Sequence, residues 1–240
     1  MSQIQVKPNT RDAKEIYLDE TYLTNNPTWH VEDSPWKALQ IIKMLSRHKI
    51  DAATVCEVGC GAGEILKQLS ASYPKTLFSG YELSPQAFKL CKTRESEKVR
   101  YFMSNLLETN SHFDVLLCVD VFEHVEDYIG FLKQLKTKAT FHIFHIPLDI
   151  TVSSVLRNTM IASRNSVGHL HYFTTETAIA TIKDSGYEIV DYFFTPSFDD
   201  LPSKTWRAKL VKMLRKLLYA ISPKTMVKLL GGCSLLVLTK

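Results

Sequence analysis

The stretch EVGCGAGEI, residues 57–65, places glycines at alternate positions directly after an apolar run. Such glycines can adopt positive φ and let the backbone approach a ligand closely. A dinucleotide-binding turn has a further glycine at its sixth position, which is Glu64 here. A carboxylate at that point, beside the start of the following helix, would repel a pyrophosphate. The turn is therefore predicted to hold a ligand other than a dinucleotide.

Two acidic residues accompany this turn. Glu57 ends the apolar run before the glycines, and Glu82 ends the next apolar run, roughly twenty residues beyond, where a carboxylate can accept hydrogen bonds from both ribose hydroxyls. The site favours a compact ligand with positive charge and a ribose. S-adenosylmethionine fits this description, because it has an ammonium, a sulfonium and a carboxylate that backbone N–H groups can receive. Its expected contacts here are Glu57, Gly59, Cys60, Gly61, Gly63, Glu82 and Leu83.

The elements that would position these residues alternate between short apolar runs and amphipathic stretches, which is typical of a mainly parallel, doubly wound α/β sheet. Ser34 and Ser84 are each expected to cap a helix whose first residue is the proline that follows, Pro35 or Pro85. Thr174 and Thr175 can cap a helix that reaches Ser185, with Gly186 as a left-handed stop. The predicted strands are Thr54–Val58, Leu77–Tyr81, Val99–Met103, Val115–Val119, Phe141–Ile146, the run YEIVDYFF at 187–194, and Ser234–Leu238.

Two regions lie outside this alternation. Residues 1–50 are predicted to form a helical cap on a main domain of residues 51–240, and residues 196–232 a helical insertion before the last strand. Within the insertion, apolar residues recur at helical spacing with basic residues opposite: Trp206, Leu210, Met213, Leu214, Leu217, Leu218 and Ile221. We expect a lid over the acceptor. The alternative is a peripheral contact of residues 206–228 with an anionic membrane surface.

Composition limits the other classes of function. The chain has 240 residues and is 45% hydrophobic, which suffices for one α/β core. It contains no long apolar span, and its first residues lack the apolar segment of a secretion signal, so we expect a soluble, cytoplasmic protein with its five cysteines reduced. The net charge of +4 is local, since residues 206–228 hold seven basic residues and no acid. Without a wider basic surface or interleaved aromatics, no nucleic-acid partner is expected.

Taken together, these motifs resemble a class I S-adenosylmethionine-dependent methyltransferase, of the group that includes the ubiquinone-biosynthesis O-methyltransferases. The similarity extends from about Thr54 to Phe194 plus the last strand, through EVGCGAG, YE, FDVLLCVDVFEHV and GHLHYFTTETAIATIKDSGYEIVDYF. It implies a Rossmann-like, seven-stranded sheet with an antiparallel last strand and the cofactor over the carboxyl ends of the strands. It also implies cofactor contacts from Asp120 and Val121, and from Ser104 and Asn105 where relatives commonly have an acid for adenine.

Three histidines are candidates for catalysis: His124, His145 and His169. Methyl transfer from a sulfonium is an in-line displacement, so the enzyme positions the nucleophile and, for a hydroxyl, removes its proton. No metal is expected as the first interpretation. The alternative is a divalent ion held by Asp120, Glu123 and His124, because some ubiquinone-type relatives depend on a metal at this pattern. These side chains can equally cap the next helix and pair with one another.

The leading hypothesis is an enzyme that transfers a methyl group from S-adenosylmethionine to a small molecule, at oxygen. Two alternatives stay open. One is a cofactor-binding protein without turnover that acts as a partner of another protein. The other is a membrane-surface methyltransferase that modifies a lipid-linked or glycan intermediate. The sequence does not indicate the acceptor or the oligomeric state.

Overall fold

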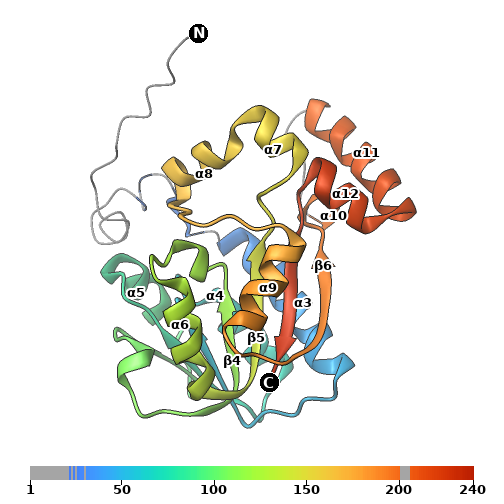
Figure 1. Ribbon diagram of the computed structural model, residues 1–240. Coiled ribbons are helices and arrows are strands. Elements are labelled where there is room, and N and C mark those ends of the chain that lie inside the picture. Colours follow the sequence, from blue (N-terminus) through green and yellow to red (C-terminus); the bar gives the residue numbers. More distant parts are fainter. Residues whose placement is uncertain (1–21, 23, 25, 30, 201–205) are drawn as a thin grey trace.

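A single mixed sheet forms the centre of the molecule (Figure 1). The computed structural model describes residues 22, 24, 26–29, 31–200 and 206–240, with the backbone alone for 199–200 and 206–208. The strand order is β3-β2-β1-β4-β5-β7-β6, and β7 runs antiparallel to both of its neighbours. The strands are β1 Thr54–Val58, β2 Leu77–Tyr81, β3 Val99–Phe102, β4 Phe113–Val119, β5 Ala139–Pro147, β6 Ile189–Thr195 and β7 Ser234–Thr239. The predicted fold class is confirmed.

Helices cover both faces of this sheet. One hydrophobic core lies between the sheet and three helices of the N-terminal half of the chain: α3 Ser34–Arg47, α4 Glu64–Ser72 and α5 Pro85–Lys92. The other core joins it to α6 Tyr128–Leu135, α9 Thr175–Asp184 and α12 Pro223–Leu230. The central strand β4 is buried along nearly its whole length, as a parallel strand between two helical layers must be. Helix α3, which was predicted to belong to a cap, packs against α4 and β7.

Local sequence explains where these helices begin. The Ser84 hydroxyl accepts a hydrogen bond from the backbone N–H of Ala87, and Pro85 occupies the first helical position, as predicted. Thr174 and Thr177 form a reciprocal capping box at α9, and Gly186 follows that helix at φ +89°. At α3 the prediction was wrong by one position. Ser34 is already helical, because the 3₁₀ turn η1 Val31–Asp33 leads directly into α3.

Further helices lie above the carboxyl ends of the strands (Figure 1). The predicted insertion contains α10 Ser197–Asp200, α11 Trp206–Ile221 and α12. Two more, α7 Val152–Arg157 and α8 Thr159–Val167, follow β5 where the sequence carried no helix prediction. The short turns η2 Leu106–Glu108, η3 Phe122–His124 and η4 Lys136–Lys138 complete the elements of the described chain. None of its helices is long and apolar enough to cross a bilayer.

Candidate active site

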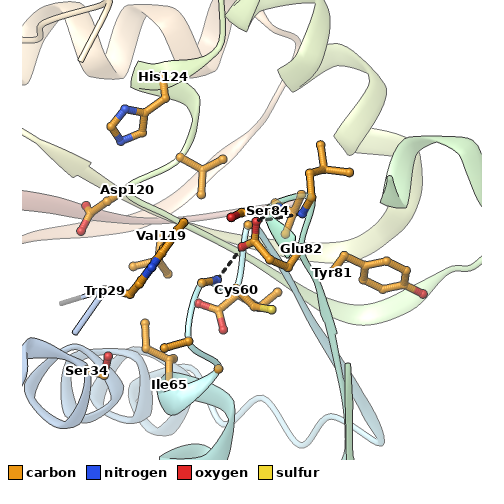
Figure 2. Close-up of a pocket in the computed structure, with 18 of the residues that line it drawn as sticks. Trp29, Ser34, Cys60, Ile65, Tyr81, Glu82, Ser84, Val119, Asp120 and His124 are labelled. Atoms are coloured by element: carbon orange, nitrogen blue, oxygen red, sulfur yellow. Dashed lines mark hydrogen bonds between the residues drawn. The ribbon is translucent and has the colours of Figure 1, made fainter. Parts of the chain in front are cut away.

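A cavity of about 600 Å³ opens at the carboxyl ends of β1, β2 and β4 (Figure 2). Nearly all of the predicted site residues line it. The exceptions are His145 and Glu123, which are absent from its walls. The predicted residues that do line the cavity are Glu57, Gly59, Cys60, Gly61, Gly63, Glu82, Leu83, Ser104, Asn105, Asp120, Val121, His124 and His169.

Glu82 organises the loops on one side of the cavity. Its Oε2 accepts a hydrogen bond of 2.8 Å from the N–H of Gly61, and its Oε1 accepts from the N–H groups of Leu83 and Ser84 at 2.8 and 2.7 Å. Burial raises the pKa of Glu82 above its ordinary value, and the three N–H donors offset part of that rise. The carboxylate thus ties the glycine turn to the end of β2, at the position expected for the ribose.

The glycine turn depends on the absence of side chains at two of its positions. Gly59 has φ +64°, and a Cβ there would lie 2.8 Å from Cγ2 of Val121. Gly63 has φ +79°, and a Cβ there would lie 2.6 Å from the ring of Tyr101, whose hydroxyl donates to the Gly63 carbonyl. Both positions therefore require a left-handed backbone and close packing at once. This geometry keeps the floor of the cavity as bare backbone.

Glu57 places a buried carboxyl group at the wall of the cavity. The side chain is 2% exposed, and its Oε2 has no hydrogen-bond partner. Burial raises the pKa of Glu57 well above its usual range. An ammonium group beside this oxygen would supply the missing partner and favour the ionised form. The orphaned carboxylate and the bare backbone together fit S-adenosylmethionine.

At the end of β4, Asp120 lies between two basic side chains. Its Oδ2 is 2.9 Å from Nζ of Lys37, and its Oδ1 is 2.6 Å from Nδ1 of His145. Burial opposes ionisation, but the charges of His145 and Lys37 hold the pKa of Asp120 well below its usual range. Asp120 has φ +53°, a conformation that asparagine and aspartate tolerate better than most residues. Sequence reasoning missed Lys37, because nothing in the pattern of α3 distinguishes it from a solvated lysine.

His145 is placed as a support for Asp120. It is 2% exposed, and both of its ring nitrogens have partners: Asp120 and, at 2.9 Å, Oγ1 of Thr195. That hydroxyl also donates to the Ser234 carbonyl. With both ring nitrogens engaged by protein side chains, His145 is placed to orient Asp120, and its role as a base stays a prediction.

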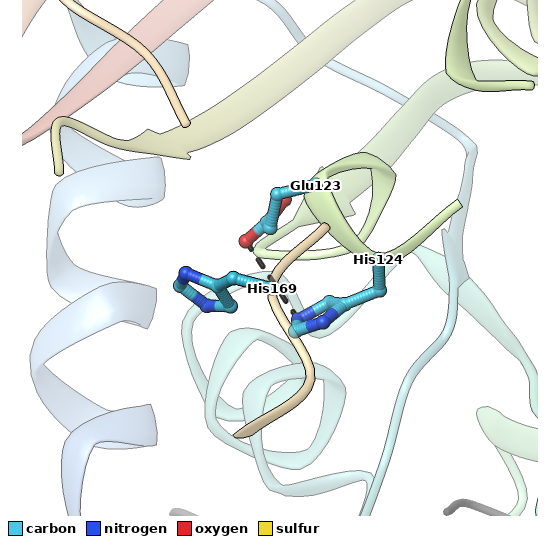
Figure 3. A group of neighbouring side chains, drawn as sticks. All are labelled: Glu123, His124 and His169. Atoms are coloured by element: carbon cyan, nitrogen blue, oxygen red, sulfur yellow. Dashed lines mark ion pairs between the residues drawn. The ribbon is translucent and has the colours of Figure 1, made fainter. Parts of the chain in front are cut away.

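His124 and His169 lie together at the cavity wall (Figure 3). Their ring centroids are 4.8 Å apart in an edge-to-face arrangement. Nδ1 of His169 is 2.6 Å from Oδ2 of Asp149, a residue that no sequence motif had indicated. Burial and the neighbouring His169 lower the pKa of His124 to about 4. The cavity thus contains one carboxylate-oriented imidazole and one that is neutral at pH 7.

The structure differs from the predicted metal-binding group in one residue: His169, and not Asp120, lies beside Glu123 and His124. Asp120 is engaged by Lys37 and His145, whereas potential ligand atoms of Glu123, His124 and His169 all lie within 4.8 Å of one another. Glu123 is fully buried, and neither of its carboxylate oxygens has a hydrogen-bond partner. Burial and Asp120 raise the pKa of Glu123 well above its usual range. One oxygen and two imidazole nitrogens form a ligand set that suits a divalent transition metal.

The two positions predicted to contact adenine, Ser104 and Asn105, both line the cavity. Asn105 Oδ1 already accepts from the Leu107 N–H, and its Nδ2 donates to Glu108. From the N-terminal region, Tyr22 and Trp29 also line the cavity, with their ring centroids 4.5 Å apart.

The methyltransferase-domain family model matches residues 31–192, which is more than half of the chain. The chain therefore belongs to this family, and its fold and site define the class as S-adenosylmethionine-dependent methyltransferase. The resemblance inferred from the motifs, and the cofactor inferred from the glycine turn and its two acids, are confirmed at the level of the family.

Curated relatives share only part of their length with this chain. A ubiquinone biosynthesis O-methyltransferase of Rickettsia canadensis is 27% identical over 107 residues, which are 42% of this chain and 45% of that protein. The corresponding protein of Nitrosospira multiformis is 29% identical over 118 residues, 44% and 48% of the two chains. The chain thus spans less than half the length of these relatives.

Solved structures extend the fold comparison over almost the whole chain. Magnesium protoporphyrin IX methyltransferase of Synechocystis PCC 6803, with S-adenosylhomocysteine bound, has a TM-score of 0.64 at 14% identity and covers 94% of this chain and 98% of its own. The plantazolicin methyltransferase BpumL, also with S-adenosylhomocysteine, has a TM-score of 0.63 at 15% identity and covers 95% and 93%. At such identities the likeness concerns the fold.

Proposed function

We propose that this protein transfers the methyl group of S-adenosylmethionine to a hydroxyl oxygen of a small molecule. The observation that carries the proposal is the Asp149–His169 pair, which borders the same cavity as Glu57 and Glu82. Bound S-adenosylmethionine supplies an electrophilic methyl group on a sulfonium. A hydroxyl is a weak nucleophile for it unless a base removes its proton.

The residues at the cavity wall divide this chemistry between them. Asp149 accepts from Nδ1 of His169, which leaves Nε2 as the basic nitrogen of the neutral ring. His169 then takes the acceptor proton as the oxygen attacks. His124, neutral at pH 7, offers a second hydrogen-bonding group to the acceptor without adding positive charge. On the other side, Glu57 receives the ammonium of the cofactor and Glu82 its ribose.

A second candidate ligand for this part of the cavity is a divalent cation. The carboxylate of Glu123 supports it, because neither oxygen has a hydrogen-bond partner among the described residues and Oε1 is 3.9 Å from His124 Nε2, beyond hydrogen-bond distance. Glu123, His124 and His169 would hold the ion. A metal there would lower the pKa of an acceptor hydroxyl and orient its oxygen. Dialysis against a chelator followed by addition of Mg²⁺, Mn²⁺ or Zn²⁺ separates the two proposals, because a histidine base acts without added metal.

The test has two stages that use the whole chain. Isothermal titration calorimetry with S-adenosylhomocysteine, beside NAD and NADP, measures cofactor binding, and micromolar binding of the first alone is expected. Release of S-adenosylhomocysteine from S-adenosylmethionine is then followed with a panel of phenols, alcohols, amines and thiols. Turnover with hydroxyl compounds supports the proposal. Binding without turnover favours the cofactor-binding partner protein, and turnover only with amines or thiols contradicts O-methylation.

A further inference from the structure

Four helices form a continuous layer above the carboxyl ends of the strands: α7, α8, α11 and α12 (Figure 1). Helix α12 packs against both α7 and α11, and α7 packs against α8. Arg215 of α11 fixes the outer helix to this layer, because its guanidinium donates to the Leu230 carbonyl of α12 at 2.7 Å. The described residues of α11 are absent from the cavity wall, where a lid over the acceptor would have to contribute.

The outer face of α11 is apolar. Met213, Leu217 and Ile221 are 63%, 61% and 74% exposed, and Leu210 and Leu214 are also exposed. These five residues, which we call the α11 stripe, recur at helical spacing and therefore lie along one side of the helix. Tyr219, on the opposite side of the helix, and Leu218, at one edge of the stripe, pack against the core. The helix thus turns its apolar stripe away from the protein.

The exposed apolar surface continues onto the neighbouring helices. On α7, Leu156 is 80% exposed and Val152 and Val155 are 51% exposed, and on α8 Ile161 is also exposed. Large apolar side chains grouped over adjoining elements mark a surface that binds something, whereas single exposed ones are ordinary. Exposed apolar side chains thus occur on α7, α8 and α11, helices that belong to the same layer.

The segments that form these helices are basic, although Lys228 is paired with Glu176 of α9, and α10, which packs against α11, ends in Asp199 and Asp200. Residues 152–167 and 206–230 contain no aspartate or glutamate, and their basic residues are Arg157, Arg164, Arg207, Lys209, Lys212, Arg215, Lys216, Lys224 and Lys228. Lys209, Lys212 and Lys216 each directly precede a member of the α11 stripe. By helix geometry Lys209 and Lys216 therefore flank the stripe on one side, while Lys212 lies further round, toward the opposite face. An apolar stripe flanked by lysines fits the boundary between acyl chains and anionic headgroups of a bilayer.

We propose that α7, α8, α11 and α12 dock this protein on the surface of an anionic bilayer. The α11 stripe enters the acyl boundary, and the lysines beside it meet the headgroups. A second copy of the same chain would bring two basic layers together, which disfavours it as the occupant. No described helix spans a membrane, so the contact is peripheral. Val167 of α8 lines the cavity, so docking holds the cavity next to the lipid surface.

Co-sedimentation of the full chain with vesicles tests this proposal. Vesicles of phosphatidylcholine alone are compared with vesicles that also contain phosphatidylglycerol, at low and high salt. We expect binding to the anionic vesicles that weakens as salt rises. The double variant Leu214→Gln/Leu217→Gln should lose at least about tenfold in affinity. The variant Lys209→Gln/Lys216→Gln should lose about fivefold per lysine.

The matched control changes exposed leucines elsewhere. Leu39→Gln/Leu77→Gln removes side chains that are 62% and 55% exposed on α3 and β2, and it should bind vesicles like the wild type. Absence of binding at low salt, or equal binding by the α11 variant and the wild type, would overturn the proposal. Self-association that the α11 variant abolishes, without vesicle binding, would identify a second copy as the occupant instead. Because vesicle binding needs neither cofactor nor acceptor, its failure is separate from failure of the proposed methyl transfer.

Discussion

The two sides of the cavity are built in different ways. The cofactor side comes from short local segments, in which backbone N–H groups and glycine conformations do most of the work, and one carboxylate, Glu82, joins them. The acceptor side comes from side chains far apart in the sequence: His124 after β4, Asp149 after β5 and His169 after α8. A substitution should therefore affect one function and spare the other, which the following predictions use.

The largest effect is expected on the acceptor side. His169→Gln removes the proposed base, so kcat should fall by about 10² to 10⁴-fold, while the affinity for S-adenosylhomocysteine stays unchanged. Steady-state kinetics with the acceptor found in the panel, together with calorimetry, measure the two quantities. His171→Gln is the matched control, because that residue bonds the Val125 carbonyl and is absent from the cavity wall. Equal losses in the two variants would remove His169 from the chemistry.

The next effect belongs to the cofactor side. Glu82→Ala leaves three backbone N–H groups without an acceptor and removes the proposed partner of the ribose, so the affinity for S-adenosylhomocysteine should fall about 100-fold. Calorimetry gives the affinity, and far-ultraviolet circular dichroism checks that the fold is intact. The exposed Glu97→Ala is the control. Unchanged affinity in folded Glu82→Ala would contradict the assignment of the ribose position.

These two sides were also unequally predictable from sequence. Glycine spacing and strand-end acids are local signals, so the glycine turn and Glu82 could be placed from the amino-acid sequence alone. Two features of the site depend on loops that the sheet brings together from distant segments. One is the position of Asp149, and the other is that His169, and not Asp120, lies beside Glu123 and His124. Periodicity does not encode such contacts. Helix α8 was missed because its weakly amphipathic sequence lacks the apolar stripe by which helices are found. Helix α7 is only six residues long, too short for a periodic pattern to predict it.

A smaller effect compares two glycines of the same turn. Gly63→Ala and Gly61→Ala both place a side chain at positive φ, which costs about 1 kcal/mol each. Only at Gly63 would the new Cβ also meet the Tyr101 ring, since the nearest atom to a Cβ at Gly61 lies 3.9 Å away in Trp29. The free energy of unfolding should therefore fall about 2 kcal/mol further in Gly63→Ala. Urea denaturation measures the difference, and equal values would show that Tyr101 moves aside freely.

The smallest effect is the pH dependence that His124 contributes. Its pKa is about 4 in the folded protein and near its ordinary value of 6.5 in the unfolded chain, so the unfolded state binds the proton first. Its contribution to stability is complete above pH 6.5 and is lost as the pH falls toward 4. By pH 5.5 the loss should be about 1.4 kcal/mol. Urea denaturation gives the free energy of unfolding of the wild type and of His124→Gln at pH 7.5 and at pH 5.5. The loss between the two pH values should be larger in the wild type, and the difference is the contribution of His124.

The comparison must isolate His124 from other buried groups. His142 also has its pKa lowered to about 4, chiefly by burial, and it contributes a similar loss in both proteins, so it cancels in the difference. If His124→Gln follows the wild-type pH dependence, His124 takes up a proton in the folded state as readily as in the unfolded chain. The imidazole of His124 would then be charged at mildly acidic pH and would repel a positively charged acceptor molecule. A neutral His124 does not repel such an acceptor.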